Sequence, residues 1–413
     1  MNKLRSIVFS VICIMILGCV LVFKGIEHSP LSSLVSSALK ETSQLEGRNY
    51  EHLPELELES IVEATFQSDF EQYVADSIPW RDQALMLNAG VQRTQISLAS
   101  KAFGYACYPT FYGSEYVYVL TRDAVVETLK TLTPSNEQAM ERAAAAISEL
   151  AEANEDVSFY LLTIDRANAS DANPTLGYVT NPLTYTVLDE QLYDRLSPAI
   201  TVTRQAYHTE DEMLDALYRT DHHWHTSMAY DCYAEQVVRM IPNALPAEVL
   251  ERISYDDIDF IGSCSRGGLC APVEPDHIDD CVIDMSGFTV VRDRKEYGAD
   301  VLEKQAAYLD GNINPDPFTN RYAEYFHGDW GLWRIDNPNA QTDQSLLIVR
   351  DSFGGCMERF FAANYAHVYV VDFRHTDVTA AQLLAEHEDI DDVLVIMGYN
   401  NLISEAGIAG LTL

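Results

Sequence analysis

Basic side chains are scarce in this sequence. Its 413 residues include 27 Lys and Arg against 63 Asp and Glu, which gives a formal net charge of −36. A nucleic-acid backbone would be repelled by this charge, so nucleic acid is excluded as a predicted partner. The acid excess itself indicates a solvated surface and says nothing about the fold. Hydrophobic residues make up 47% of the chain, enough for one large domain or two to three smaller ones.

Common zinc-binding cysteine pairs are also lacking, as are internal repeats and low-complexity tracts. Cys264, Cys270 and Cys281 match none of the CxxC spacings, so a zinc knuckle is not expected. Cys13 and Cys19 lie in an apolar run near the start, and the other six cysteines lie beyond it, an even number that permits disulfides. Because Cys264 and Cys270 enclose the short segment SRGGL, we predict a disulfide between them.

One long apolar run is present. After the basic segment MNKLR, the chain from Ser6 to Phe23 carries no charge, and Lys24 closes the run. It is long enough to cross a bilayer as a helix, and the preceding basic residues orient it with the rest of the chain outside. We therefore predict a single-pass membrane anchor at residues 1–24. A cleaved signal peptide, which would give a secreted protein, and a lipoprotein with Cys19 as the lipidated residue are the alternatives. All three place the bulk of the chain outside the cytoplasmic membrane.

The remainder divides into a linker and one main domain. Residues 25–60 are polar and mixed, and they predict a stalk, whereas residues 61–413 are expected to form the domain. Two helices are expected at its start, separated at Pro79. Residues 240–340 are rich in Asp, Gly and Pro and lack long periodic stretches, so they predict an irregular insertion with short strands around GFTVVRD.

Alternating helices and strands predict an α/β fold. Ser135 is the expected N-cap of an Ala-rich helix, and residues 157–164 follow as a buried strand. Near the C-terminus, apolar strand runs at 345–349, 367–371 and 392–397 alternate with helical segments. Short connections of this kind imply a parallel sheet with right-handed crossovers. The segments RDSFGG, DFRHTD and GYNN follow these three strands, so all three are expected at the ligand-binding edge of the sheet.

Ser352 of RDSFGG lies in a tight turn between a buried strand and a helix. The nucleophilic serine of α/β hydrolases is presented in the same way, and the helix that follows offers free N–H groups to a developing oxyanion. Gly354 and Gly355 let the backbone approach a ligand closely. The alternative is that Ser352 or Asp351 is only the N-cap of the helix.

The segment TDHHWHTS has three interpretations. Asp221 and His223 are two apart, so in an extended loop they share a face, and the carboxylate can orient the imidazole as a base for a serine. Asp221, His223 and His225 could instead bind a metal. The third interpretation is a hydrogen-bonded turn with Trp224 packed inward, which leads into a helix from Ser227 with Thr226 as its N-cap. Spacing alone does not choose among the three.

Three segments resemble a known family. YRTDHHWHTSMAYDCYAEQV resembles the signature of the bacterial DHHW protein family. FEQYVADSIPWRDQAL and LLIVRDSFGGCMERFFAANYAHVYVVDFRHTD resemble its N-terminal and C-terminal blocks, so the resemblance touches residues 66–402 and is weak over 240–340. These proteins are similar to membrane-associated alginate O-acetyltransferases of the SGNH-like hydrolase superfamily. The resemblance implies a three-layer α/β fold with a parallel sheet, in which an Asp-x-His pair precedes the serine, the reverse of the usual SGNH order.

The resemblance implies a role for each matching residue. Asp221 would orient and stabilise the imidazole of His223, which would take the proton from Ser352, and Ser352 would attack and hold the acyl group. The backbone N–H of Ser352 is the first candidate for the oxyanion donor, and Tyr399 and Asn400 of GYNN are expected to contribute to oxyanion or substrate binding by their position at the end of the third strand. No metal and no cofactor is implied.

Two arginines are expected at the same edge of the sheet. Arg350 and Arg374 would bind an anionic sugar, or would form salt bridges to Asp351 or Asp372. Arg350 also stands where SGNH hydrolases have a glycine before Asp-Ser, so one oxyanion donor is expected to come from elsewhere.

The resemblance implies an extracytoplasmic enzyme that transfers or removes acyl groups, in particular acetyl, on a cell-surface polysaccharide through an acyl-serine intermediate. The transferase version predicts a membrane partner that delivers the acyl group. Two other classes stay open: a non-catalytic glycan-binding surface protein and a metal-binding protein centred on the DHHWH cluster. His222 and His225 receive no role from the resemblance.

Overall fold

The structure is a computed structural model. It describes residues 41–43, 45–55, 65–104, 107–108, 117–268, 273–328 and 330–413, together with Gly18, Val22 and Ile26. The predicted anchor therefore lies almost wholly outside the described residues, as does much of the predicted stalk. Among the helices that are described, none is long and apolar enough to cross a membrane. The chain divides into two compact units, Met1–Tyr105 and Ala106–Leu413.

The first unit contains the two helices expected about Pro79. Helix α3 spans Thr65–Asp76 and helix α4 spans Arg81–Phe103, with Trp80 between them at a φ of 53°. Two short strands, β1 (Thr42–Ser43) and β2 (Arg48–Asn49), pair as a hairpin within the predicted stalk. Arg48 donates to both carboxylate oxygens of the buried Asp76 at 2.7 Å, so the described part of the stalk is tied to α3.

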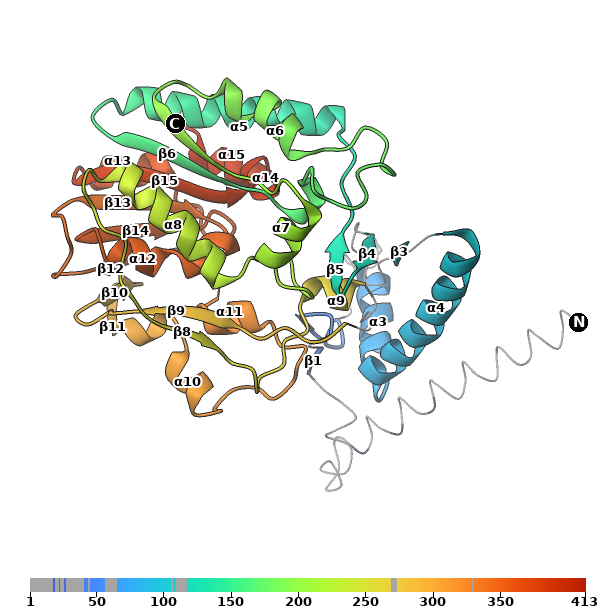
Figure 1. The fold of residues 1–413 in the computed structure, drawn as a ribbon. Helices are drawn as coiled ribbons and strands as arrows, with labels where there is room; N and C mark the ends of the chain where they lie inside the picture. Colours follow the sequence, from blue (N-terminus) through green and yellow to red (C-terminus); the bar gives the residue numbers. More distant parts are fainter. Residues whose placement is uncertain are drawn as a thin grey trace, which may run out of the picture. The chain divides into compact units, whose positions relative to one another are not determined.

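The second unit is built on a large sheet. Its eight described strands have the order β11-β10-β12-β14-β13-β15-β6-β7 (Figure 1). The last five run parallel, which confirms the predicted parallel sheet. In the order of the sheet the strands are β11 (Lys295–Gly298), β10 (Thr289–Arg292), β12 (Leu332–Asp336), β14 (His367–Val371), β13 (Ser345–Arg350), β15 (Ile390–Gly398), β6 (Ser158–Ile164) and β7 (Ile200–Gln205).

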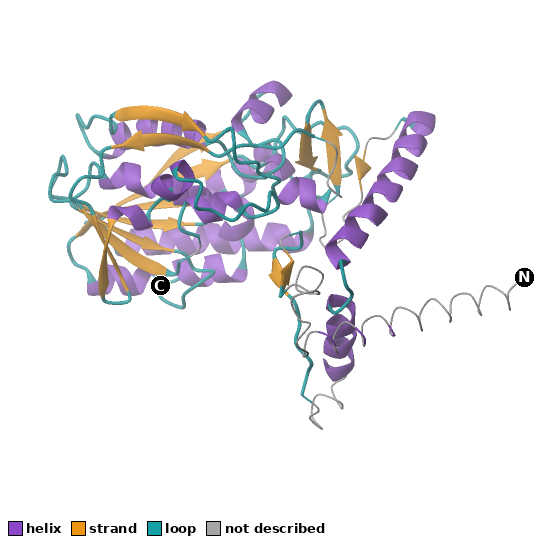
Figure 2. Ribbon diagram, turned by 90° about the horizontal axis from the view of Figure 1, so that it is seen from below, coloured by secondary structure: helices purple, strands orange, loops and turns teal. Residues whose placement is uncertain are grey.

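Both faces of the sheet are covered, because parallel strands present apolar side chains on each side. Along β15, Leu394 and Ile396 belong to one core cluster, and Val393 and Val395 belong to the other. Helices α8 and α12 pack on the first face, and α5, α13 and α15 pack on the second (Figures 1 and 2). The helices of the unit are α5 (Pro134–Ala153), α6 (Tyr185–Gln191), α7 (Glu210–Ala216), α8 (Thr226–Met240), α9 (Ser263–Gly267), α10 (Gln305–Leu309), α11 (Arg321–Tyr325), α12 (Glu358–Ala362), α13 (Ala380–Glu386), α14 (Tyr399–Leu402) and α15 (Glu405–Leu411).

Two local predictions need correction. The N-cap of α5 is Thr133, not Ser135: Thr133 and Asn136 form a capping box, and Pro134 takes the first helical position, where its missing N–H costs nothing. The helix expected after Ser352 is a short 3₁₀ helix, Ser352–Cys356, followed by α12. A Cβ on Gly354 would lie 2.7 Å from the Cβ of Arg350, so this tight turn depends on glycine.

The region 240–340 is more regular than predicted. It contributes β10, β11 and β12, which extend the main sheet as antiparallel strands beyond β14. It also contributes a separate pair, β8 (Val249–Ser254) and β9 (Asp279–Ile283). A smaller sheet lies outside this region and contains β3 (Cys107–Tyr108), β4 (Tyr118–Thr121) and β5 (Ala124–Glu127). The short strands predicted around GFTVVRD are present as β10 and β11, whereas the other strands of this region were not predicted, because short strands with few apolar positions leave a weak periodic signal.

The predicted disulfide is not supported. Cys264 is a free and buried cysteine in α9, where Tyr118 and Val125 surround it. Its predicted partner Cys270 lies outside the described residues. Burial raises the pKa of the Cys264 thiol well above its usual value, so this side chain behaves as a small core residue.

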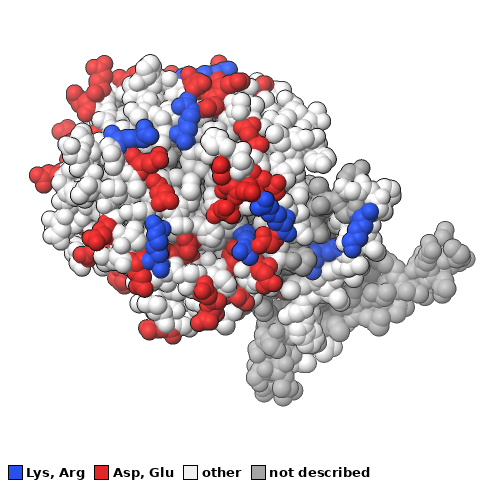
Figure 3. All heavy atoms as spheres, viewed as in Figure 1, with Lys and Arg blue, Asp and Glu red and all other residues white. Residues whose placement is uncertain are grey.

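Acidic side chains are spread over the face of the described surface that Figure 3 draws. On the face drawn in Figure 3 they are more numerous than the basic ones. This agrees with the excess of 63 acidic over 27 basic residues in the sequence.

Replacing Leu394 tests the core. The side chain is fully buried in the central strand β15, so Leu394→Ala is expected to lower the free energy of unfolding by about 2–5 kcal/mol through lost contacts and a residual cavity. Leu250→Ala is the matched control, since Leu250 is 60% exposed and its loss is expected to change stability by less than about 0.5 kcal/mol. Urea unfolding measures both, and equal losses would contradict the assigned core.

A buried carboxyl at the end of β6 predicts a pH dependence. Burial raises the pKa of Asp165 from 3.8 to about 7, while hydrogen bonds from the Tyr207 N–H and the Ser170 hydroxyl only partly oppose it. The folded protein therefore binds more protons than the unfolded chain between these values, so stability falls as the pH rises through this window. Asp165→Asn is expected to flatten this fall in thermal melts, and an unchanged slope would count against it.

Candidate active site

Two carboxylates hold the loop that enters α8: Asp276 accepts from the backbone N–H groups of Arg219 and Thr220 at its start, and Asp279 binds its end. Asp279 accepts hydrogen bonds from the backbone N–H groups of Thr226 at 3.2 Å and Ser227 at 3.1 Å. Nδ1 of His225 lies 3.0 Å from the same carboxylate. An anion at a helix N-terminus is favourable, because the first N–H groups there have no partner within the helix. The predicted N-cap Thr226 is instead the first residue of the helix, and His225 takes the N-cap position without a side-chain cap.

Trp224 joins this loop to the turn that carries Ser352. Its side chain is fully buried, its Nε1 donates to the carbonyl of Phe353 at 3.1 Å, and the two rings meet edge to face at 5.7 Å. The inward packing expected for Trp224 is therefore present. Its effect is to fix the position of the histidine loop against the end of β13.

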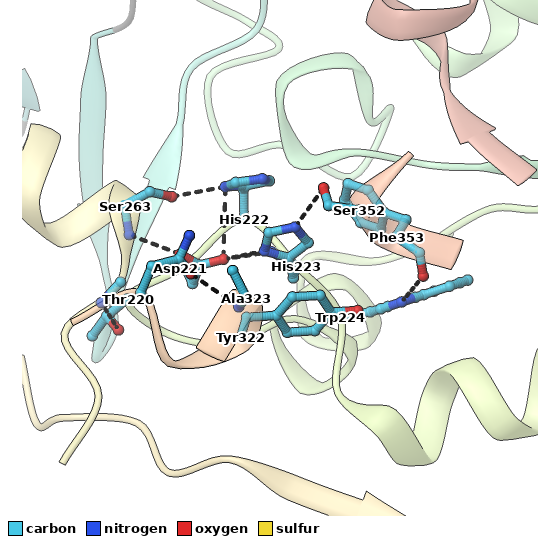
Figure 4. Close-up of polar contacts among 12 residues, drawn as sticks. Thr220, Asp221, His222, His223, Trp224, Ser263, Tyr322, Ala323, Ser352 and Phe353 are labelled. Atoms are coloured by element: carbon cyan, nitrogen blue, oxygen red, sulfur yellow. Dashed lines mark hydrogen bonds and ion pairs between the residues drawn. The ribbon is translucent and has the colours of Figure 1, made fainter. Parts of the chain in front are cut away.

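The structure brings Asp221, His223 and Ser352 together (Figure 4). Nδ1 of His223 lies 2.6 Å from Oδ1 of Asp221, and Nε2 of His223 lies 2.8 Å from Oγ of Ser352. His223 and Ser352 are 129 residues apart in the chain. The carboxylate thus accepts from one ring nitrogen and leaves the other beside the hydroxyl, which is the geometry of a nucleophilic triad.

A segment of the region 240–340 positions Asp221. The backbone N–H of Ser263 donates to Oδ2 of Asp221 at 2.7 Å, and the N–H of His223 donates to Oδ1 at 3.1 Å. Gly262 packs directly on this side chain, and a Cβ there would lie 2.3 Å from the Cβ of Asp221. Burial by itself would raise the pKa of Asp221. The charges of His222 and His223 and these hydrogen bonds outweigh burial and lower the pKa well below its usual value.

Aromatic rings fix the plane of the His223 imidazole. Tyr322 of α11 stacks on it with a centroid distance of 4.0 Å and an angle of 5° between planes, and Phe353 packs at 5.1 Å. The hydroxyl of Tyr322 donates to Sγ of Cys356 at 3.3 Å, which locks the tyrosine in place. Sequence reasoning missed Ser263 and Tyr322, because long-range contacts place both residues and no local spacing marks them.

Asp351 holds the serine turn to the neighbouring strand. It is the N-cap of the 3₁₀ helix, and its Oδ1 accepts from the N–H of Phe353 at 3.0 Å. Its Oδ2 accepts from the N–H of Gly398 at 2.9 Å and from Nδ2 of Asn401 at 2.7 Å. The capping role considered for this turn therefore falls to Asp351, and Ser352 keeps its hydroxyl for His223.

Tyr399 and Asn400 do not meet the expectation placed on them. The side chain of Tyr399 is buried in the core on the second face of the sheet, and neither residue lines the cleft above Ser352. Oδ1 of Asn400 accepts from Arg166 at 2.9 Å, and Arg166 lies over the ring of Phe353 at 5.3 Å. Asn400 therefore contacts the serine turn only through the side chain of Arg166.

The cleft above Ser352 has a volume of about 180 Å³. Arg350 and Arg374 both line it. Both pair with Asp372, which agrees with the salt bridges that were predicted as one alternative. Nη1 of Arg350 lies 3.2 Å from Asp372, and Nε of Arg374 lies 2.9 Å from it. The remaining lining residues are His222, His223, Asn320, Tyr322, Ala323, Phe326, Gly328 and Gly355. The cleft therefore combines a nucleophile, a base and two fixed positive charges.

His222 also lines the cleft. Its Nδ1 lies 2.7 Å from Oγ of Ser263, on the side of the ring away from Ser352 (Figure 4). Burial, followed by the neighbouring charge of His223, lowers the pKa of His222 well below its usual value. Among the described residues, Asp221, His222 and His223 offer metal-ligand atoms within 4.8 Å of one another. His225, which the metal-binding alternative grouped with Asp221 and His223, faces Asp279 instead.

Comparison with known proteins agrees with the fold. The family model described as DHHW protein matches residues 205–371, which confirms the resemblance seen in the sequence. Bacillus cereus PatB1, solved with a sulfonyl adduct, has a TM-score of 0.56 and 16% identity over 71% of this chain and 98% of its own. A DHHW family protein from Eubacterium siraeum has a TM-score of 0.55 and 17% identity over 75% of this chain and 99% of its own.

A third solved structure, the O-acetyltransferase domain of Pseudomonas putida AlgJ, has a TM-score of 0.36 and 14% identity over 71% of this chain and 98% of its own. The comparison with curated proteins gave no match. PatB1 and the Eubacterium protein thus share with this chain a mixed α/β fold around a mostly parallel sheet.

Gly262→Ala tests how Asp221 is positioned. The added methyl group has no room beside Asp221, so the Asp221–His223 hydrogen bond is expected to break and stability to fall by about 1–3 kcal/mol. The downfield Nδ1 proton resonance of His223 reports the bond. Gly177→Ala is the control, since nothing lies within 4 Å of a Cβ there, and it is expected to leave the resonance unchanged. A Gly262→Ala protein that keeps this resonance would contradict the assignment.

Proposed function

We propose that this protein is an extracytoplasmic serine-dependent enzyme of the SGNH-like type that transfers or removes acyl groups, in particular acetyl, on a cell-surface polysaccharide. The observation that carries the proposal is the contact of 2.8 Å between Nε2 of His223 and Oγ of Ser352, with Asp221 at 2.6 Å behind the ring. The sequence resemblance to alginate O-acetyltransferases supports acetyl as the group and a glycan as its carrier.

The first half of the reaction would acylate the serine. His223 takes the proton of Ser352 while Oγ forms a bond to the acyl carbonyl carbon. The tetrahedral intermediate collapses when the bond to the leaving oxygen breaks, and His223 returns the proton to that oxygen. Asp221 stays ionised throughout, in keeping with its lowered pKa, and stabilises the imidazolium that forms.

The second half would release the acyl group by the same steps. A hydroxyl of the acceptor gives its proton to His223 and attacks the carbonyl carbon of acyl-Ser352, and the proton then returns to Oγ. A sugar hydroxyl as acceptor makes the protein a transferase, and water makes it an esterase. The stacked ring of Tyr322 keeps His223 in the orientation that both halves need.

The oxyanion would be stabilised by the backbone N–H of Ser352, at the start of the 3₁₀ helix Ser352–Cys356, because the next two N–H groups, of Phe353 and Gly354, already donate to Asp351. Gly355 lines the cleft, so the backbone comes close to the reacting carbonyl there. Arg350 and Arg374, although paired with Asp372, would attract an anionic substrate to the same cleft.

The apolar run Ser6–Phe23 supports an extracytoplasmic site for the reaction. We place the chain at the cell membrane as a single-pass protein, with a lipoprotein at Cys19 and a secreted protein as the alternatives. A transferase in this place needs an acyl donor from inside the cell, so its partner would be a membrane protein that passes the acyl group outward.

Ser352→Ala tests the proposed chemistry. The variant loses the nucleophile, so hydrolysis of a chromogenic aryl acetate is expected to fall by at least about a thousandfold, with a similar fall for His223→Ala. Ser254→Ala on β8 is the control and is expected to keep full activity. An active Ser352→Ala variant would overturn the acyl-serine step. A stoichiometric metal ion that His223→Ala removes would favour the metal-binding alternative, and full glycan affinity without turnover would favour the binding protein.

A further inference from the structure

A larger groove lies on the antiparallel half of the main sheet. It has a volume of about 840 Å³. Strands β10 and β12 and the end of α13 form its walls, and the side chains that matter most are Arg292, Arg294, Trp330, Arg334, Tyr369 and His375. None of these residues takes part in the triad.

The groove begins where the catalytic cleft ends. Gly328 and Arg374 line the cleft, whereas Trp330 and His375, one or two positions further along the same two segments, line the groove. Because Leu332 at the start of β12 pairs with Val371 at the end of β14, both segments lie at the carboxyl edge of the parallel strands. A chain lying in the groove can therefore reach the cleft above Ser352.

Positive charge collects in the groove, in contrast to the rest of the chain. Three arginines line it, against the two acids Asp293 and Glu386, and two of the arginines are paired, Arg292 with Asp293 and Arg334 with Asp336. In the whole sequence, by comparison, 63 acidic residues stand against 27 basic ones. A strongly acidic protein repels polyanions, so a groove with a local excess of arginine indicates a site where one is admitted.

Two of the arginines are held in fixed positions. The guanidinium of Arg292 lies over the ring of Trp330 at 4.2 Å, and the ring of His327 packs on Trp330 at 4.4 Å. Nη2 of Arg334 donates to Asp336 at 2.9 Å. Its guanidinium lies 5.8 Å from the ring of Tyr369. Stacking of this kind orients the planar N–H groups of an arginine before a ligand binds.

The third arginine sits in a strained turn. Asp293 and Arg294 connect β10 to β11 with φ angles of 51° and 61°, a region that arginine rarely adopts. Asparagine or glycine would occupy this turn at lower cost. Both φ angles are those that a two-residue hairpin turn requires, and the turn leaves Arg294 exposed where it lines the groove.

We propose that this groove binds a polyanionic surface glycan, whose acidic groups lie along Arg292, Arg294 and Arg334 while a neighbouring unit enters the cleft at Ser352. The reaction of one glycan unit at Ser352 rests on the proposed function. The binding of the acidic groups rests on the residues of the groove alone. Arginine recognises carboxylate and phosphate with the same planar pair of N–H groups, so the acidic groups are uronic acids or phosphodiesters.

Binding to the full chain that carries Ser352→Ala tests this proposal without turnover. Calorimetric titration compares three probes of equal length: an oligogalacturonate, an oligo(glycerol phosphate) and a neutral cello-oligosaccharide. We expect one anionic probe to bind and the neutral probe to bind at least about tenfold more weakly. Adding Arg292→Ala or Arg294→Ala is expected to lower the affinity for the anionic probe by about tenfold each. Arg292→Lys is expected to lower this affinity by less than Arg292→Ala does.

The matched control is Arg142→Ala, which removes an exposed arginine that pairs with Glu405, and neither residue lines the groove, so binding is expected to stay unchanged. Preference for the carboxylate or the phosphate probe identifies the source of the charge. Equal binding of the neutral probe, or full anionic binding after both groove arginines are replaced, overturns the proposal. Because the assay contains no reaction, an inactive triad would leave its result unaffected, and a failed titration would leave the aryl acetate result standing.

Discussion

Two hydrogen bonds connect Asp221, His223 and Ser352, and the rest of the second unit has to hold these three side chains in position. These bonds join a loop before α8 to a turn after β13, so both must be fixed to within a few tenths of an ångström. Asp279 ties down the first, Asp351 ties the second to the end of β15, and the buried Trp224 connects them. Each support is a buried or half-buried polar contact or a buried ring, so the geometry is set before any substrate arrives.

The antiparallel half of the unit supplies further contacts to the Asp221–His223 pair. The region 240–340 supplies the N–H of Ser263 to Asp221 and the ring of Tyr322 to His223, and its strands extend the sheet away from the cleft. A parallel sheet alone would present Ser352 at its edge but would leave the Asp-His pair without a second wall. The same added strands carry the arginine groove, so one region both orients the base and offers a surface beside it.

Strands and helices that follow from a continuous residue pattern were predicted well from the sequence. Strand 367–371 was predicted with its observed bounds, because a strand buried on both faces is an unbroken apolar run. The meeting of Asp221, His223 and Ser352 followed from the family resemblance and the sheet edge. Ser263 and Tyr322 were missed because long-range contacts place them, and Tyr399 was misassigned because position after a strand does not tell which way a side chain points.

The central claim is that Ser352 carries the acyl group during the reaction. Rapid acid quenching of the protein with an aryl acetate, followed by intact mass measurement and peptide mapping, tests it most directly. We predict a transient increase by the mass of one acetyl group, located on the peptide that contains Ser352, and its absence in Ser352→Ala. Turnover of the ester with no acetyl on that peptide, or with acetyl on another residue at a competent rate, would contradict it.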